Sequence, residues 1–84
     1  MKIVRMNLLD NSSGSKLLAF FDIETDDGIV IKNLRLLTGV NGLFTTPPNE
    51  KGKDDKYYDT IIFPKNIKDA VEKAAIEEYN KLKQ

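Results

Sequence analysis

The dipeptide Asp27-Gly28 constrains the fold of this 84-residue chain more than any other feature, because it separates two runs rich in Ile, Val, Leu and Phe. Asp-Gly is typical of the two-residue loop of a β-hairpin, where positive φ is required. Such a loop predicts the register of the two strands, with Ala19 opposite Leu36 and Phe21 opposite Leu34. Because this face is largely apolar, we expect it to meet the core. Its two remaining pairs are Ile23 with Lys32, and Thr25 with Val30.

The other face of the predicted hairpin is mixed. Its pairs are Leu18 with Leu37, Phe20 with Arg35, Asp22 with Asn33, and Glu24 with Ile31. Three apolar members of this face, Leu18, Phe20 and Leu37, have no obvious cover. Uncovered apolar groups of this kind mark surfaces that bind a partner, so we predict that these three residues contribute to an interface.

Turn residues and prolines bound the remaining strands. The Asn-Gly within residues 39–42 predicts a turn, and Pro47-Pro48 and Pro64 each end a strand because proline cannot donate to a ladder. The resulting segments are, in order, a first strand over 2–9, a Ser/Gly loop over 11–15, a short strand over 43–46, a charged loop over 49–56 and a last strand over 57–63.

After Pro64 the pattern changes to that of an amphipathic helix. Asn66 is a suitable N-cap, and Asp69 places a negative charge in the first turn, where it stabilises the helix dipole. Ile76 points away from the apolar stripe, which consists of Ile67, Ala70, Val71, Ala74, Ala75, Tyr79 and Leu82. The sequence therefore predicts an α+β fold, with a small antiparallel sheet of about five strands and one C-terminal helix, in a single domain over residues 1–84.

Composition excludes most kinds of catalytic chemistry. The chain has no cysteine and no histidine, which removes disulfides, thiolate zinc sites, cysteine nucleophiles and the commonest general base. Asp22, Glu24 and Asp26 alternate along one strand and could gather a divalent cation, but we interpret them as an exposed strand face with Arg35 diagonal to Asp22. We therefore expect no enzyme activity, no metal ligand, no cofactor and no small-molecule substrate.

The charge balance gives no global attraction to a partner. Thirteen basic residues face thirteen acidic ones, so neither nucleic acid nor anionic lipid is attracted over the whole surface. The N-terminus lacks the pattern of a signal peptide, and no stretch approaches the roughly 18 apolar residues of a membrane span. We expect a cytoplasmic protein that is not bound to a membrane.

One segment resembles a known family: Asn33-Leu34-Arg35-Leu36-Leu37-Thr38-Gly39-Val40-Asn41-Gly42-Leu43-Phe44. It is similar to the SpoVG family, the bacterial stage V sporulation protein G or septation regulators. In that family an apolar-Arg-apolar-apolar strand precedes Gly and Asn-Gly-Leu-Phe, and a proline-containing loop, an aromatic strand and a helix follow. The last two correspond here to residues 58–64 and 74–82, so the resemblance covers nearly the whole chain.

The resemblance implies a cytoplasmic regulator that binds DNA or RNA as a homodimer joined through strands. Family binding is attributed to the basic loop after the proline and to surface near the helix, which puts Lys51 in this role. Glu50 stands where the family has a second basic residue, so we expect weaker binding than the family name suggests.

From the same loop and the helix end we add further candidates, which gives a predicted nucleic-acid surface of Asn49, Lys51, Lys53, Lys56, Lys81 and Lys83. The plainer alternatives stay open. Lysines of a charged loop can be merely solvated, and lysines at a helix C-terminus complement the dipole. Tyr57 and Tyr58 could stack on bases, but adjacent strand residues point to opposite faces, so we expect one of them in the core.

Ile76, on the helix side away from the stripe, joins Leu18, Phe20 and Leu37 as a predicted dimer contact. A small core without disulfides gains stability from oligomerisation. The first hypothesis is thus a homodimeric nucleic-acid-binding regulator of transcription or of a later step, in sporulation or septation. The alternative is a protein–protein interaction module that keeps this fold and has lost nucleic-acid binding.

Overall fold

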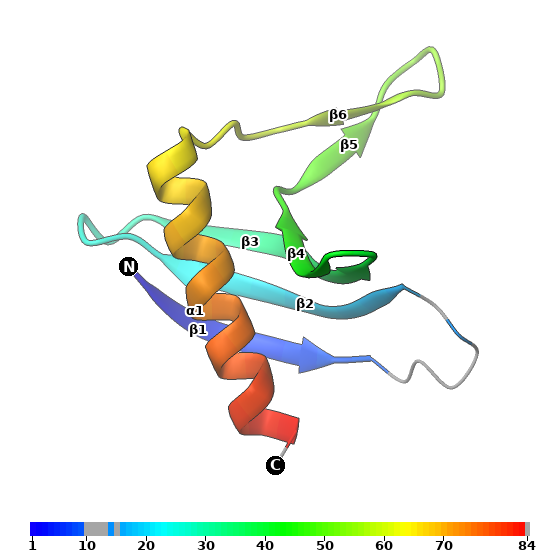
Figure 1. The fold of residues 1–84 in the computed structure, drawn as a ribbon. Coiled ribbons are helices and arrows are strands. Elements are labelled where there is room, and N and C mark those ends of the chain that lie inside the picture. Colours follow the sequence, from blue (N-terminus) through cyan, green and yellow to red (C-terminus); the bar gives the residue numbers. More distant parts are fainter. Residues whose placement is uncertain (10–13, 15, 84) are drawn as a thin grey trace.

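The computed structural model describes residues 1–9, 14 and 16–83, and their fold is α+β, as predicted. Four strands form an antiparallel sheet in sequence order: β1 (Lys2–Leu8), β2 (Leu17–Glu24), β3 (Val30–Gly39) and β4 (Gly42–Thr46). A separate two-stranded sheet and a helix complete the fold: β5 (Asn49–Lys51), β6 (Tyr57–Asp59) and α1 (Lys65–Lys83). Figure 1 shows α1 lying across one face of the four-stranded sheet, whereas β5 and β6 project away from that sheet. The Ser/Gly loop predicted over 11–15 falls almost entirely outside the described residues.

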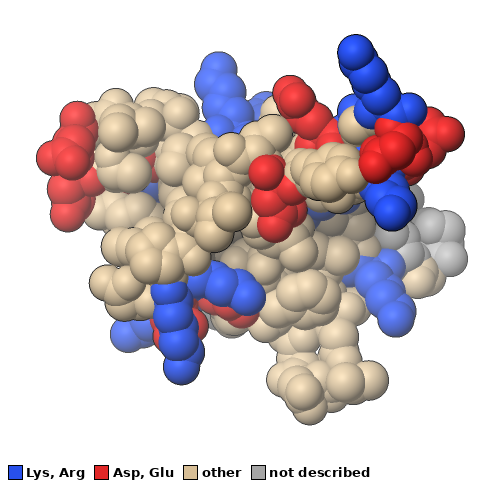
Figure 2. Space-filling model, turned by 90° about the horizontal axis from the view of Figure 1, so that it is seen from above, with Lys and Arg blue, Asp and Glu red and all other residues tan. Residues whose placement is uncertain are grey.

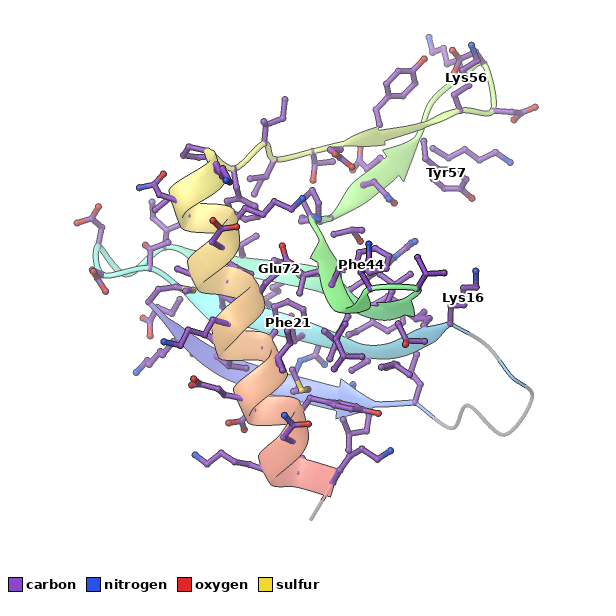
Figure 3. The ribbon with its side chains drawn as sticks, in the orientation of Figure 1. Lys16, Phe21, Phe44, Lys56, Tyr57 and Glu72 are labelled. Carbon is purple, nitrogen blue, oxygen red and sulfur yellow. The ribbon has the colours of Figure 1, made fainter. Side chains whose placement is uncertain are left out.

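The core lies between the sheet and α1, on the face that the sequence predicts. Phe21 is fully buried there, and Figure 3 shows its ring between β2 and the helix. The buried apolar residues that pack with it are Leu18, Ala19, Ile23, Leu34, Leu36, Val71, Ala75 and Tyr79. Alternation along the strands and a spacing of four along the helix bring these side chains together. The other side of the sheet is not covered by α1 and is called the open face below.

The turn between β2 and β3 differs from the prediction by one residue. Asp26 and Asp27 are the central residues of the turn, and the Gly28 N–H donates to the Thr25 C=O over 2.9 Å. Gly28 has a φ of 87°, so it is the left-handed residue that closes a three-residue type of hairpin loop. The predicted pairs next to the turn are therefore wrong: Ile23 pairs with Ile31, and Glu24 with Val30.

A β-bulge in β3 restores the predicted register further along the hairpin. Asn33 is the extra residue and has a φ of 67°. Beyond the bulge Phe21 pairs with Leu34, as predicted; the same holds for Phe20 with Arg35 and Ala19 with Leu36. The shift at the turn and the shift at Asn33 thus cancel, which keeps the apolar residues on the core face.

A second irregularity corrects the expectation for Leu18. Leu17, not Leu18, pairs with Leu37, and the register shifts between Leu17 and Ala19. Leu18 is 5% exposed and belongs to the core. The expectation that Leu18 lies on an uncovered face is therefore wrong, because an irregular strand no longer alternates its side chains.

Residues 49–59 form a short hairpin, where the sequence predicts a loop over 49–56 and a strand over 57–63. Asn49 pairs with Asp59 and Lys51 with Tyr57, so part of the predicted loop is strand. The pairing continues only to Thr60, whose N–H donates to Pro48 C=O over 2.8 Å. Phe63 then packs against the core, which leads the chain toward the helix and ends the strand earlier than predicted.

The helix begins at Lys65, earlier than predicted. Lys68 N–H donates to Pro64 C=O over 2.9 Å, so Asn66 is a helical residue and not the N-cap, and Asp69 lies beyond the first turn. Ile76 is half-buried and packs against the core, so the expectation that it points away is wrong. Ile67 and Leu82, predicted in the stripe, are exposed. No helix in the described part of the chain has the length and apolarity to cross a membrane.

Candidate nucleic-acid interface

Residues 49–59 form an arm that carries most of the predicted binding residues. Its loop is closed by the Gly52 N–H, which donates to Lys56 C=O over 2.7 Å, and by the Asp55 N–H, which donates to Gly52 C=O over 3.1 Å. Asp55 has a φ of 65°, a conformation that aspartate tolerates in turns. Backbone hydrogen bonds therefore fix the course of this charged loop.

Tyr58 contacts the loop through its hydroxyl and its ring. Its hydroxyl donates to Asp54 Oδ2 over 2.6 Å, and its ring lies so near Gly52 that a Cβ there would be 2.8 Å from Tyr58 Cε2. The Tyr58 hydrogen bond, helped by the Lys56 N–H, lowers the pKa of Asp54. The same bond raises the pKa of Tyr58, because it stabilises the protonated hydroxyl. Glycine at position 52 is thus needed for the close approach of the ring.

Lysines and tyrosines lie exposed along the arm. Lys51 Nζ is 3.5 Å from Asp55 Oδ1, a solvent-exposed pair that stabilises little. Among the residues that the structure describes, neither Lys53 nor Lys56 forms an ion pair. Tyr57 is 65% exposed and Tyr58 53%, so the expectation that one of them is in the core is wrong. Figure 3 shows Lys56 and Tyr57 at the far end of the arm.

A groove of about 700 Å³ separates the base of the arm from the open face of the sheet. Its sheet wall consists of residues of β2 and β3, and its other wall consists of Pro48, residues of β5 and residues after β6. The lining residues are Phe20, Val30, Ile31, Lys32, Asn33, Arg35, Pro48, Asn49, Glu50, Thr60 and Ile61. Asn49, a predicted contact, is half-buried, and its Oδ1 is buried without a hydrogen-bond partner within the described residues.

Arg35 and Phe20 form the centre of the sheet wall. The guanidinium carbon of Arg35 is 5.8 Å from the centroid of the Phe20 ring, a cation–π contact. Within the described ranges, Arg35 and Lys32 form no ion pair. A planar cation that rests on a ring and is not neutralised by a carboxylate can bind an anionic or aromatic group.

Asp22 differs from the exposed carboxylate that the sequence predicts. It is 5% exposed and its partner is Arg5, with Arg5 Nε 3.0 Å from Asp22 Oδ2, whereas Arg35 was expected diagonal to it. The Asn33 N–H donates to Asp22 Oδ1 over 3.0 Å. Burial raises the pKa of Asp22, but the Asn33 and Arg5 hydrogen bonds and the charges of Arg5 and Lys32 outweigh burial, so the pKa is lowered. Nowhere in the described residues do three carboxylates gather as a metal site.

The helix-end lysines lie apart from the arm. Lys81 and Lys83 are in the last turn of α1, which Figure 1 shows at the opposite end of the molecule from β5 and β6. Lys83 Nζ is 5.4 Å from the centroid of the Tyr79 ring. A single chain therefore does not bring the two predicted groups of lysines together.

The predicted interface residues are also dispersed. Phe20 lies under Arg35 in the groove, and Leu37 is half-buried on the open face, opposite Phe44 of β4. Ile76 is on α1, on the other side of the sheet, and Leu18 is in the core. Leu37 pairs with Leu17 of β2 on one side and with Phe44 of β4 on the other, and these three apolar residues are called the end patch below.

Sequence reasoning missed the groove, although one signal was present. The predicted register already placed Phe20 opposite Arg35, and the structure confirms this pair. The second wall was not predictable, because residues 49–51 read as loop and their return over the open face depends on pairing with β6. Lys32 and Asn33 enter the groove at the bulge, which no residue pattern indicated.

The charges of this side of the molecule are intermixed. Figure 2 shows basic and acidic side chains interspersed on the face seen from above, including the end from which the arm projects. Residues 49–56 contain three lysines and three acidic residues. Attraction of a polyanion to this surface must therefore arise from individual side chains and not from a broad basic patch.

Comparison with known proteins places the chain in a family. A family model described as SpoVG matches residues 1–81. A Borrelia hermsii protein named "Putative septation protein SpoVG" is 37% identical over 81 residues, which cover 93% of this chain and 83% of the relative. Proteins of the same name from Fusobacterium nucleatum and Clostridium perfringens are 29% and 28% identical, over 96% and 99% of this chain and 88% and 93% of the relatives. The chain therefore belongs to the SpoVG family.

Proposed function

We propose that this chain is a cytoplasmic, homodimeric regulator that binds DNA or RNA, in septation or sporulation, and that it acts by binding and not by catalysis. The observation that supports this most is the arm, whose exposed Lys53 and Lys56 carry charges that no described carboxylate neutralises. Exposed Tyr57 adds an aromatic surface beside them. Lysines give salt-dependent contacts to phosphate, and aromatic rings stack on bases.

The test is fluorescence anisotropy with labelled DNA and RNA at about 50 and 200 mM salt, the range in which phosphate contacts lose affinity. We expect binding at the lower salt that weakens at the higher. The double variant Lys53→Gln and Lys56→Gln should weaken it several-fold, and Lys51→Glu should do so as well. Lys73→Gln, at an exposed position of α1, is the matched control and should bind like the wild type. Absence of binding at the lower salt would contradict the proposal.

A second candidate is a protein–protein interaction module on the same fold. The pairing of Lys51 with Asp55 favours it, because one of the arm's lysines is already partly neutralised. Glu50 and Asp54 further offset the positive charge of the arm. A stoichiometric protein partner recovered by the chain, together with flat anisotropy for nucleic acid, would select this candidate.

A further inference from the structure

The groove between the open face and the arm has the size and the chemistry of a binding site. Its volume of about 700 Å³ lies within the roughly 300–1,000 Å³ of small-ligand sites. Its walls combine one aromatic ring, two cations without ion-pair partners in the described residues, and an amide whose buried oxygen lacks a donor. These groups come from Phe20, Lys32, Arg35 and Asn49. Such a set suits a ligand with a flat ring and a negative charge.

Arg35 is placed for stacking. The guanidinium carbon of Arg35 lies over the Phe20 ring, 5.8 Å from its centroid, and no carboxylate of the described residues pairs with it. Guanidinium planes and aromatic rings are the surfaces on which unpaired bases stack. Lys32 is a point charge of the kind that contacts phosphate, and Asn49 can bond to the edge of a base. The single carboxylate of the lining, Glu50, opposes only part of this positive charge.

We propose that this groove binds unpaired nucleotides of a single strand, with a base stacked on Arg35 and a phosphate near Lys32. A double helix keeps its bases stacked and paired inside, so it cannot present one to a groove of this size. The proposal rests on the proposed function and sharpens it: the chain prefers single-stranded to double-stranded nucleic acid. The arm then forms one side of the path of the strand.

The experiment compares a labelled single strand of about 12 nucleotides with the duplex of the same sequence, within the usual site sizes. Arg35→Lys keeps the charge and removes the stacking plane. We expect the wild type to bind the single strand more tightly than the duplex, because only the single strand presents unpaired bases for stacking. Arg35→Lys should lose about tenfold in single-strand affinity, with duplex binding unchanged. Lys73→Gln, outside the groove, should keep the wild-type affinity, and thermal unfolding of each variant verifies the fold.

The outcomes separate this inference from the proposed function. If the wild type binds neither probe, the proposed function fails. If it binds and Arg35→Lys binds equally well, the groove inference is overturned and the function stands. If Arg35→Lys changes the oligomeric mass but not the single-strand affinity, the groove holds a second copy and the inference is equally overturned.

NMR titration of the wild type with the unlabelled strand decides the matter independently of any variant. We expect the amide signals of Asn33, Asn49 and Thr60 to shift, because these residues line the groove. Shifts confined to the tip of the arm, around Lys53 and Lys56, would overturn the inference.

Discussion

Asp22 lies on the open face of the sheet, where its carboxylate accepts one hydrogen bond from the Asn33 N–H and others from Arg5. The bulge at Asn33 has a left-handed backbone, and the carboxylate satisfies the amide that the bulge removes from the ladder. Sequence reasoning placed Asp22 opposite Asn33 but read the carboxylate as exposed. The burial of Asp22 could not be predicted from the sequence, because it depends on where Arg5 of β1 pairs. Three strands together define the site.

Asp22→Asn should therefore destabilise the protein. The amide keeps the shape of the side chain but removes the charge that Arg5 contacts, and hydrogen bonds to charged groups contribute about 1.5–3 kcal/mol. We expect a fall of about 2 kcal/mol in the free energy of unfolding, measured by urea denaturation. Glu77→Gln, which changes an exposed residue of α1, is the control and should leave the midpoint nearly unchanged. An equal midpoint for Asp22→Asn would show that the buried contacts contribute nothing.

Acid should remove the stabilisation that Asp22 provides. Its pKa is lower in the folded state than the ordinary value of 3.8, so protons bind the unfolded state more tightly. The contribution is fully present above that ordinary value and is lost as the pH falls through the lower, folded-state pKa. The urea midpoints of wild type and Asp22→Asn should differ by a constant amount well above the ordinary value of 3.8 and should approach each other as the pH falls through the lower, folded-state pKa. A difference that persists unchanged in acid would contradict the assignment.

Among the elements, those with regular alternation were predictable from sequence. The core face of β2 and β3, the turn before Gly42 and the amphipathic helix all follow from residue spacing and turn chemistry. The arm was not predictable from the sequence, because a two-stranded sheet with exposed side chains has no apolar pattern to indicate it. Its lysines lie on one segment of the sequence, but the course of that segment depends on the backbone hydrogen bond between Gly52 and Lys56.

The helix offers a test of which face is buried. Val71 is 1% exposed and Ile67, one turn earlier, is 42% exposed, although the helical wheel put both in one stripe. Val71→Ala should lower the free energy of unfolding by about 2 kcal/mol, since the lost methyl groups leave a cavity. Ile67→Ala should change it by less than about 0.5 kcal/mol. Chemical denaturation of the two variants side by side measures the contrast, and equal losses would mean that the helix packs differently.

At the scale of the whole molecule, the two faces of the sheet differ in what lies against them. One face is covered by α1 and supplies the core, and the open face presents the groove and the end patch. Because a chain of this size buries only about 60–65% of its unfolded surface, covering the end patch with a second copy would add to stability. One wall of the groove could be predicted from the sequence, because the Phe20–Arg35 pair follows from the hairpin register. The opposing wall could not, because its position depends on the tertiary structure.

Leu37→Asp tests the proposed homodimer. The wild type should sediment at twice the chain mass, and a charge between Leu17 and Phe44 of the end patch should shift it toward the monomer. Ile62→Asp is the control, because Ile62 is an exposed apolar residue outside the patch, and it should leave the mass unchanged. A monomeric wild type at high concentration would refute the homodimer. If both variants keep the wild-type mass, the contact lies elsewhere.

The bulge in β3 also determines how the chain length can change. Between the pairs Ile23–Ile31 and Phe21–Leu34, β3 has two residues where β2 has one, and Asn33 is the one with the left-handed φ, so deleting Asn33 would leave these as neighbouring pairs of the same face. Deleting Leu36 instead would turn the rest of β3 over and exchange its core and solvent faces. Circular dichroism should show a folded, less stable protein for the first deletion and an unfolded one for the second. A deletion in β3 is therefore better tolerated at the bulge than beyond it, and the bulge is also the site that holds Asp22 in place.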